Sequence, residues 1–222
     1  MAERYGEIPK RFTKKWWEYF WDYYKIHTIV TIFAIAMIAL LIYQQVTKIH
    51  YDMNITYVSD LTPDENYSLT LQDNLSDTMA DINDDGEKHI YLNQYVFNDK
   101  YKDEEFTSAI ITGFQYEFLS EKSMLFVFSK EKSDYLFKNA NFTADAFLTI
   151  DQWLDSDIDK EMMLYSNGKP YGVSLSNSAI NPDEKREFFV AIRKPLSYDK
   201  EGISDSFKNI IEVANAMISL KQ

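Results

Sequence analysis

The chain has 222 residues, of which 45% are hydrophobic and 16% aromatic, which leaves room for one folded domain of ordinary size and an appendage. Its net charge is -12, and residues 1–25 hold six of the 23 basic side chains but only four of the 35 acidic ones, so the remainder is too acidic to favour nucleic-acid binding. The sequence has no cysteine, which excludes disulfides, thiolate zinc sites, iron–sulfur clusters and cysteine nucleophiles.

The first predicted element is an uncharged apolar run at residues 26–47. At about 1.5 Å per residue, a helix over this run is roughly 33 Å long, close to the hydrocarbon core of about 30 Å. A buried core helix and a cleavable signal peptide are the alternatives. No polar face interrupts the run, however, and cleavage after Ala36 would leave the apolar MIALLIY on the mature terminus. We therefore expect a retained, single transmembrane helix.

Basic residues before this run predict its orientation, because Lys and Arg resist translocation. Six of them lie in residues 1–25, whereas only Lys48 follows the run closely. We expect residues 1–25 to be cytoplasmic and residues 48–222 to form an extracytoplasmic domain, which makes the chain a single-pass, signal-anchor protein of the cell membrane.

The segment KRFTKKWWEYFWDYYK directly precedes the run and is rich in aromatic residues. Such rings favour the headgroup layer, so the segment predicts an interfacial anchor continuous with the span and in contact with the lipid bilayer. A partner-binding helix is the alternative. The predicted membrane-interface residues are Trp16, Trp17, Tyr19, Phe20, Trp21, Tyr23, Tyr24 and, near the other end of the span, Tyr43.

Beyond the span, strand and helix patterns alternate. Predicted strands at 51–59, 88–97 and 123–129 are each followed by a predicted helix, and these helices end near Ile82 or cover 103–122 and 130–139. Two more strands are predicted at 169–176 and 186–194, and a final amphipathic helix at 204–221 begins at Ser204 or Asp205. This order predicts a three-layer α/β domain with a largely parallel, mixed sheet.

Three segments in the middle of the chain, SMLFVFSKEKSDYLFKNANF, FLTIDQWLDSD and NGKPYGVSLSNS, carry a resemblance to a known family. Together they resemble extracellular solute-binding proteins of the two-lobe type, in which a strand with the pattern of Asn167, Gly168, Lys169, Tyr171 and Gly172 crosses between the lobes. The whole chain also looks like uncharacterised single-pass membrane proteins of Gram-positive bacteria. The resemblance implies a fold similar to one lobe of a periplasmic-type solute-binding protein, since about 170 residues make one such unit.

The stretch DINDDGEKHIYL begins like a calcium loop. Asp81, Asn83 and Asp85 alternate as ligands would, and Gly86 stands where such a loop turns sharply. Position 12, which needs a bidentate Glu, is Leu92 and falls in a predicted strand. The alternative is a helix-to-strand turn built from Asn, Asp and Gly, and we favour it over calcium, with no metal or other cofactor expected.

The inventory of catalytic residues is short. The histidines are His27, His50 and His89, no nucleophile, metalloprotease or nucleotide-binding motif is present, and we assign no catalytic or cofactor-binding residue. Because ligands favour the carboxyl ends of strands in open α/β sheets, the loops at 59–64, 98–103 and 129–134 form the predicted functional face, with ordinary polar loops as the alternative.

Three hypotheses about function follow. The first is a membrane-anchored, non-enzymatic domain that binds a small solute or a protein partner. The second is a structural subunit of a membrane complex that contacts its partners through the aromatic segment. The third is a hydrolase on the same scaffold, which would have to use His89 or a carboxylate pair.

Overall fold

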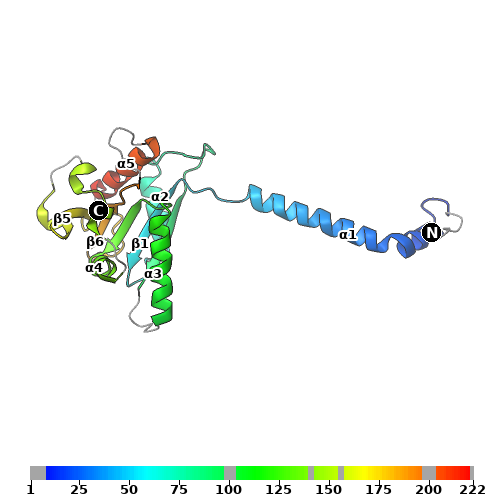
Figure 1. Cartoon of the computed structure of the whole chain (residues 1–222). Helices are drawn as coiled ribbons and strands as arrows, with labels where there is room; N and C mark the ends of the chain where they lie inside the picture. Colours follow the sequence, from blue (N-terminus) through cyan, green and yellow to red (C-terminus); the bar gives the residue numbers. More distant parts are fainter. Residues whose placement is uncertain (1–8, 98–103, 140–142, 155–157, 197–203, 221–222) are drawn as a thin grey trace. The chain divides into compact units, whose positions relative to one another are not determined.

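The computed structural model describes residues 9–97, 104–139, 143–154, 158–196 and 204–220. The chain divides into two compact units, Met1–Ile49 and His50–Gln222 (Figure 1).

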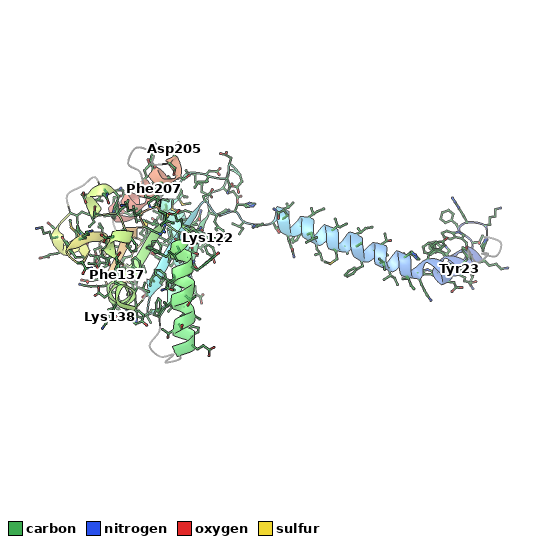
Figure 2. All side chains as sticks on the ribbon, viewed as in Figure 1. Tyr23, Lys122, Phe137, Lys138, Asp205 and Phe207 are labelled. Atoms are coloured by element: carbon green, nitrogen blue, oxygen red, sulfur yellow. The ribbon has the colours of Figure 1, made fainter. Side chains whose placement is uncertain are left out.

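The N-terminal unit contains one continuous helix, α1 (Lys14–Val46), of 33 residues. Thr13 caps its start, because the Thr13 side-chain oxygen accepts a hydrogen bond from the Trp16 N–H at 3.3 Å. None of the helix is buried, and its side chains, Tyr23 among them, project outward (Figure 2), which argues against a buried core helix. α1 is long and apolar enough to span a membrane, a property that a signal sequence near the N-terminus would share.

The second unit is built on a six-stranded sheet with the strand order β2-β1-β3-β6-β5-β4. The strands are β1 (Met53–Ser59), β2 (Ile90–Val96), β3 (Leu125–Ser129), β4 (Met163–Ser166), β5 (Lys169–Ser174) and β6 (Phe188–Ile192). β1 is parallel to β2 and to β3, whereas the other three strand pairings are antiparallel. The expectation of a largely parallel sheet is therefore wrong for the second half of the domain, and the sheet is mixed.

One of the antiparallel pairings follows from a short connection. Strands β4 and β5 are joined by Asn167 and Gly168 alone, both with positive φ (51° and 78°). Two residues of this kind form the hairpin turn that Asn-Gly favours, and a two-residue connection permits only antiparallel pairing. The sequence resemblance places the Asn-Gly pair in a strand pattern that crosses between lobes, whereas the pair forms the tip of a hairpin. The sequence patterns also predict no strand at the position of β4.

Helices cover both faces of the sheet, as the three-layer prediction requires (Figure 1). Helices α2 (Tyr67–Leu75) and α5 (Asp205–Ser219) pack on one face, and α3 (Glu104–Leu119) and α4 (Lys130–Asn139) on the other. Short 3-10 turns lie at Ala144–Ala146, Ile150–Gln152 and Lys160–Met162. The first layer is mostly aliphatic, while the second is dominated by the rings of Phe114, Phe118, Phe126, Phe128 and Phe147.

Helix α2 ends at Leu75 instead of near Ile82, and a tertiary contact accounts for the difference. The buried side chain of Asn209 on α5 donates a hydrogen bond to the Thr78 carbonyl at 2.9 Å and accepts one from the Ala80 N–H at 3.0 Å. These two bonds pair backbone groups that a longer helix would have paired internally. Helix α5 begins as predicted, with Ser204 as its cap.

Two leucines on α2 give a direct test of this packing. The Leu71 side chain is fully buried, whereas Leu69, two positions earlier and therefore on the opposite side of the helix, is 60% exposed. We expect Leu71→Ala to lower the free energy of unfolding by about 2–5 kcal/mol, because it leaves a cavity in the core. Leu69→Ala is the matched control and should change it by less than about 0.5 kcal/mol. Urea unfolding of the full chain in detergent, followed by tryptophan fluorescence, measures both; equal effects would contradict the assigned helix face.

Candidate functional site

The carboxyl ends of β1 and β3 lie side by side at a switch in the chain's direction. The two strands are parallel neighbours, with Val58 opposite Phe128. After β1 the chain continues into α2 on one face of the sheet, and after β3 it continues into α4 on the other. Connections that depart to opposite faces leave a crevice between the strand ends, where ligands of open α/β sheets bind.

A cavity of about 210 Å³ occupies this end of the sheet. It is lined by two runs of three residues that are far apart in sequence: Ser129, Lys130 and Glu131 at the β3–α4 junction, and Lys185, Arg186 and Glu187 before β6. The antiparallel direction of β6 brings the second run to this edge, because an antiparallel strand starts where its neighbour ends. The lining residues comprise three basic and two acidic side chains, although the chain as a whole has a net charge of -12.

Ion pairs connect the cavity to the loop after β1. The guanidinium of Arg186 pairs with the carboxylate of Asp60 and lies 3.7 Å from an oxygen of Asp183. Burial alone raises the pKa of Asp60, but the hydrogen bond from Arg186 and the local backbone N–H outweigh it, so this pKa falls below its ordinary value. Lys130 pairs with Glu187, with 2.8 Å between Nζ and Oε2, and this contact raises the pKa of Lys130.

An aromatic contact fixes the position of the loop after β1. The ring of Tyr57 stacks on Phe188 with 5.6 Å between centroids, and its hydroxyl donates a hydrogen bond to the Leu61 carbonyl at 3.0 Å. Burial raises the pKa of Tyr57 to about 12, so the phenol remains a neutral donor. This stacking holds the start of β6 and the end of β1 together, next to the ion pairs of Arg186.

Ser129 has an unusual position in this cavity. Its side chain is 4% exposed, and its hydroxyl has no hydrogen-bond partner among the residues that the structure describes. It directly precedes α4, a helix of 10 residues, and therefore stands where a capping residue would. The positive end of the helix dipole and the Lys130 and Arg186 side chains surround the same space. Such a cluster can bind a carboxylate or a phosphate group.

The structure brings together two of the three loops predicted to form the functional face. Residues 59–64 and 129–134 meet through Arg186 and the cavity, whereas residues 98–103 lie outside the described residues. The run Lys185–Glu187 was not predicted as part of the site. The sequence feature that could have indicated this run is a cluster of charges directly before the apolar strand FFVAI. The position of the cluster depends on the direction of that strand, which the sequence pattern does not give.

The calcium-like stretch forms a turn in which side-chain oxygens bind backbone amides. Asp81 accepts a hydrogen bond from the Gly86 N–H, Asn83 from the Asp85 N–H, and Asp85 from the Glu87 N–H, each at 2.9 Å. Within the described residues, no group of three or more His, Cys, Asp or Glu side chains is placed to hold a metal ion. The geometry supports the turn interpretation.

Asp52, just before β1, anchors this turn to the sheet. Its carboxylate accepts hydrogen bonds from the amides of Ile82 at 2.8 Å, Asn83 at 3.4 Å and His89 at 2.9 Å. The His89 ring contacts the Glu87 carboxylate at 2.9 Å. His89 precedes β2 and thus lies at the amino edge of the sheet, away from the crevice at the carboxyl edge.

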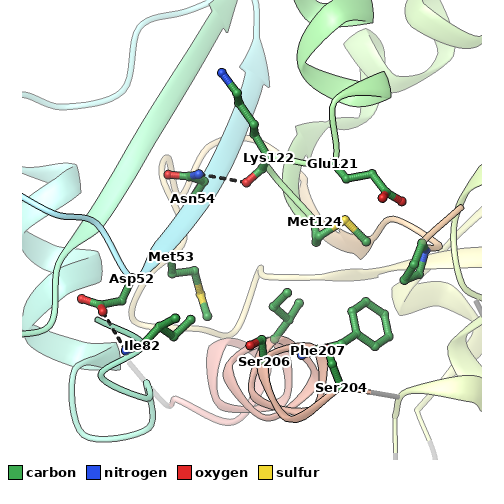
Figure 3. Close-up of a pocket in the computed structure, with 12 residues that line it drawn as sticks. Asp52, Met53, Asn54, Ile82, Glu121, Lys122, Met124, Ser204, Ser206 and Phe207 are labelled. Carbon is green, nitrogen blue, oxygen red and sulfur yellow. Dashed lines mark hydrogen bonds between the residues drawn. The ribbon is translucent and has the colours of Figure 1, made fainter. Parts of the chain in front are cut away.

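A larger cavity, about 310 Å³, lies at this amino edge beside the start of α5 (Figure 3). The apolar side chains that line it are Met53, Ile82, Met124, Pro195, Phe207 and Ile210. Its main polar groups are already paired within the protein: the Asn54 amide donates to the Lys122 carbonyl at 2.8 Å, and Glu121 accepts from Arg193 at 2.8 Å. We therefore favour the smaller cavity, where the Ser129 hydroxyl has no partner among the described residues, as the functional site.

The predicted membrane-interface residues all lie on α1. Trp16, Phe20 and Tyr24 form a ladder at i, i+4 spacing, with centroids 5.6 Å and 5.7 Å apart. Because Tyr43 lies 19 positions after Tyr24 on this continuous helix, the two are about 28 Å apart along its axis, close to the thickness of a hydrocarbon core. The spacing fits an aromatic residue at each interface.

Comparisons with known proteins add no family to this description. No protein-family model matches the chain, and neither the curated proteins nor the solved structures contain a match.

The turn at Asp81–Asp85 yields a prediction about calcium. We expect the melting temperature of the full chain to be the same in calcium as in chelator, because Asp81 Oδ2, Asn83 Oδ1 and Asp85 Oδ1 each accept a backbone N–H bond and no group of three acidic or histidine side chains in the described residues is placed to hold an ion. Thermal unfolding in detergent, followed by circular dichroism, measures this. A rise with calcium that disappears in Asp81→Ala and Asp85→Ala would contradict the turn interpretation; Asp73→Ala, on exposed α2 surface, is the control.

Proposed function

We propose that the chain is a membrane-anchored binding protein whose outer domain binds a small anionic solute, one that carries a carboxylate or a phosphate, at the carboxyl edge of its sheet. The observation that carries the proposal is a cavity lined by Lys130, Lys185, Arg186 and Ser129, whose buried hydroxyl has no partner among the described residues. A buried hydroxyl without a partner destabilises a protein, so a group that supplies the missing bond would be bound favourably.

Charge supports an anion over a cation at this site. Three basic side chains line the cavity against two acidic ones, and the start of α4 adds a partial positive charge. Arg186 offers a planar fork and Lys130 a point charge, and an anion would replace the Asp60 and Glu187 carboxylates that now pair with them. The acidic side chains Glu131 and Glu187 at the same cavity favour a solute that also carries an amino group over a simple anion.

The proposal is one of binding without turnover. His89, the only histidine in the outer domain apart from His50 at its start, lies at the opposite edge of the sheet. The Glu187 and Asp60 carboxylates beside the cavity are engaged in ion pairs, and the sequence has no catalytic motif.

The anchor is the second part of the proposal. We infer that α1 stays in the mature protein as a single span, with its basic end in the cytoplasm and the binding domain outside. The continuity of α1, the spacing of its aromatic residues and the excess of Lys and Arg before the span support this arrangement.

Ser129 gives the sharpest test of the binding site. We expect the melting temperature of the full chain to rise by several degrees in excess phosphate, a dicarboxylate or an amino acid, relative to chloride at equal ionic strength. A ligand at a hundred times its Kd adds about 2.7 kcal/mol of stability. Ser129→Ala should abolish the rise without lowering the stability of the ligand-free protein, because it removes an unpaired group.

Ser123→Ala is the matched control, since Ser123 is also buried but donates to the Asn54 carbonyl at 3.0 Å. It should lower the ligand-free stability by about 1 kcal/mol and keep the ligand response. The proposal would be contradicted if none of the three solutes raised the melting temperature, or if the rise were equally large in Ser129→Ala. The solute that gives the response distinguishes phosphate from carboxylate recognition.

The predicted orientation has its own test. Protease added to intact cells should release a fragment that contains the outer domain, because residues 48–222 are expected outside. A cytoplasmic protein in the same cells should remain intact until the membrane is permeabilised. Protection of the outer domain in intact cells would show the opposite orientation, and recovery of the domain in the medium without protease would show that α1 is cleaved as a signal sequence.

A further inference from the structure

The two edges of the sheet differ in how they are protected against pairing. The β4 edge has four residues and a register shift between Leu164 and Tyr165. The β2 edge has seven residues, IYLNQYV, with no charge and no proline. Soluble proteins usually blunt a long edge strand with charges, proline or a bulge, because its free backbone groups pair readily with another strand. β2 carries none of these devices.

Hydrogen bonds at the two ends of β2 reveal which amides point outward. The Phe97 N–H donates to the Ser59 carbonyl beside β1 at 2.7 Å, and the His89 carbonyl accepts from the Asp52 N–H at 2.9 Å. The Ile90 N–H points the other way, toward Gln72 on α2. Since backbone groups alternate along a strand, the even-numbered positions of β2 face away from β1.

Gln72 already behaves like one residue of an additional strand. Its side-chain oxygen accepts the Ile90 N–H at 2.8 Å, and its side-chain nitrogen donates to the Lys88 carbonyl. A neighbouring strand would make the same two bonds with its backbone. Beyond this point the described part of the chain offers no partner to the outward amides of Leu92, Gln94 and Val96.

Charge around this edge selects the kind of partner. Helices α2 and α3, which both contact β2, contain the acids Asp73, Glu105 and Glu117 among their described side chains and no Lys or Arg. The Tyr95 hydroxyl of β2 donates a hydrogen bond to the Gly113 carbonyl of α3 at 3.1 Å, one turn before Glu117. Burial raises the pKa of Tyr95, and the carboxylate of Glu117 raises it further. A second copy of the chain would bring the same acids against each other, whereas a basic segment would not.

We propose that the outer edge of β2, from Leu92 to Val96, binds an extended segment of a partner protein by strand addition, and that this segment is uncharged at its centre and carries Lys or Arg at its flanks. Backbone bonds to Leu92, Gln94 and Val96 provide the affinity, and the acids of α2 and α3 select basic flanks. The surface is separate from the anion site, so either can exist without the other.

The test uses the full chain in nanodiscs of zwitterionic phosphatidylcholine, to which a basic peptide has little affinity of its own. The probes are two capped peptides with the same uncharged β-branched centre, one flanked by Lys pairs and the other by Glu pairs. Hydrogen exchange of β2 is measured with each. We expect the Lys peptide to slow exchange at Leu92, Gln94 and Val96 and the Glu peptide to leave it unchanged.

Gln94 is the site of the key variant because its side chain is exposed and its backbone groups face outward. Gln94→Pro removes an outward donor without touching the bonds to β1, and proline is tolerated at such edge positions. It should weaken binding of the Lys peptide roughly tenfold, whereas Gln94→Thr, which keeps the N–H, should bind as the parent does. Glu117→Gln should weaken it without altering the strand, and it keeps the test decisive if the proline variant is unstable.

Three results would overturn the proposal. The first is that neither peptide changes hydrogen exchange at the outward amides, and the second is that both peptides slow it equally. The third is that exchange slows with protein concentration alone, which would make a second copy of the chain the occupant of the edge.

Discussion

The outer domain depends on one constraint: β1 has a parallel neighbour on each side. A parallel neighbour is reached only by a crossover over a face of the sheet, and the crossovers to β2 and to β3 use opposite faces. Both faces of β1 must therefore be covered, and six of its seven residues are buried. The same topology separates the connections that follow β1 and β3, so the crevice with Ser129 is a consequence of how the core is closed.

Elements with strong local patterns could be predicted from the sequence, and those set by tertiary contacts could not. The uncharged run in α1 and the apolar stripe of α5 predict these two helices, and the apolar run of β3 predicts a strand that is covered on both faces. The end of α2 depends on Asn209, more than 120 positions later, and no local pattern indicates that contact. The direction of the last strands was missed because the Asn-Gly turn was interpreted as part of a longer strand pattern.

The candidate site shows the same division. Its location at strand ends follows from a general rule about open α/β sheets, and the rule selected the loops after β1 and β3 correctly as neighbours. Arg186 could not be placed, because its distance from those loops depends on β6 running antiparallel to β3. Nor does any pattern in the sequence mark Ser129 among the other serines, since an unpaired hydroxyl is a property of its surroundings.

The two edges of the sheet use their charged groups in different ways, and the difference favours the carboxyl edge for function. At the amino edge, the Asp52 carboxylate binds backbone amides, and removing such an acceptor costs about 1–3 kcal/mol. At the carboxyl edge, Lys130 pairs with Glu187 through side chains that are each 57% exposed, a contact worth about 0–1 kcal/mol. Under the proposed function, an incoming anion would take the place of Glu187 on Lys130 at little cost, without releasing any backbone group. Charged groups held only by one another are free to exchange partners, and those that hold the fold are not.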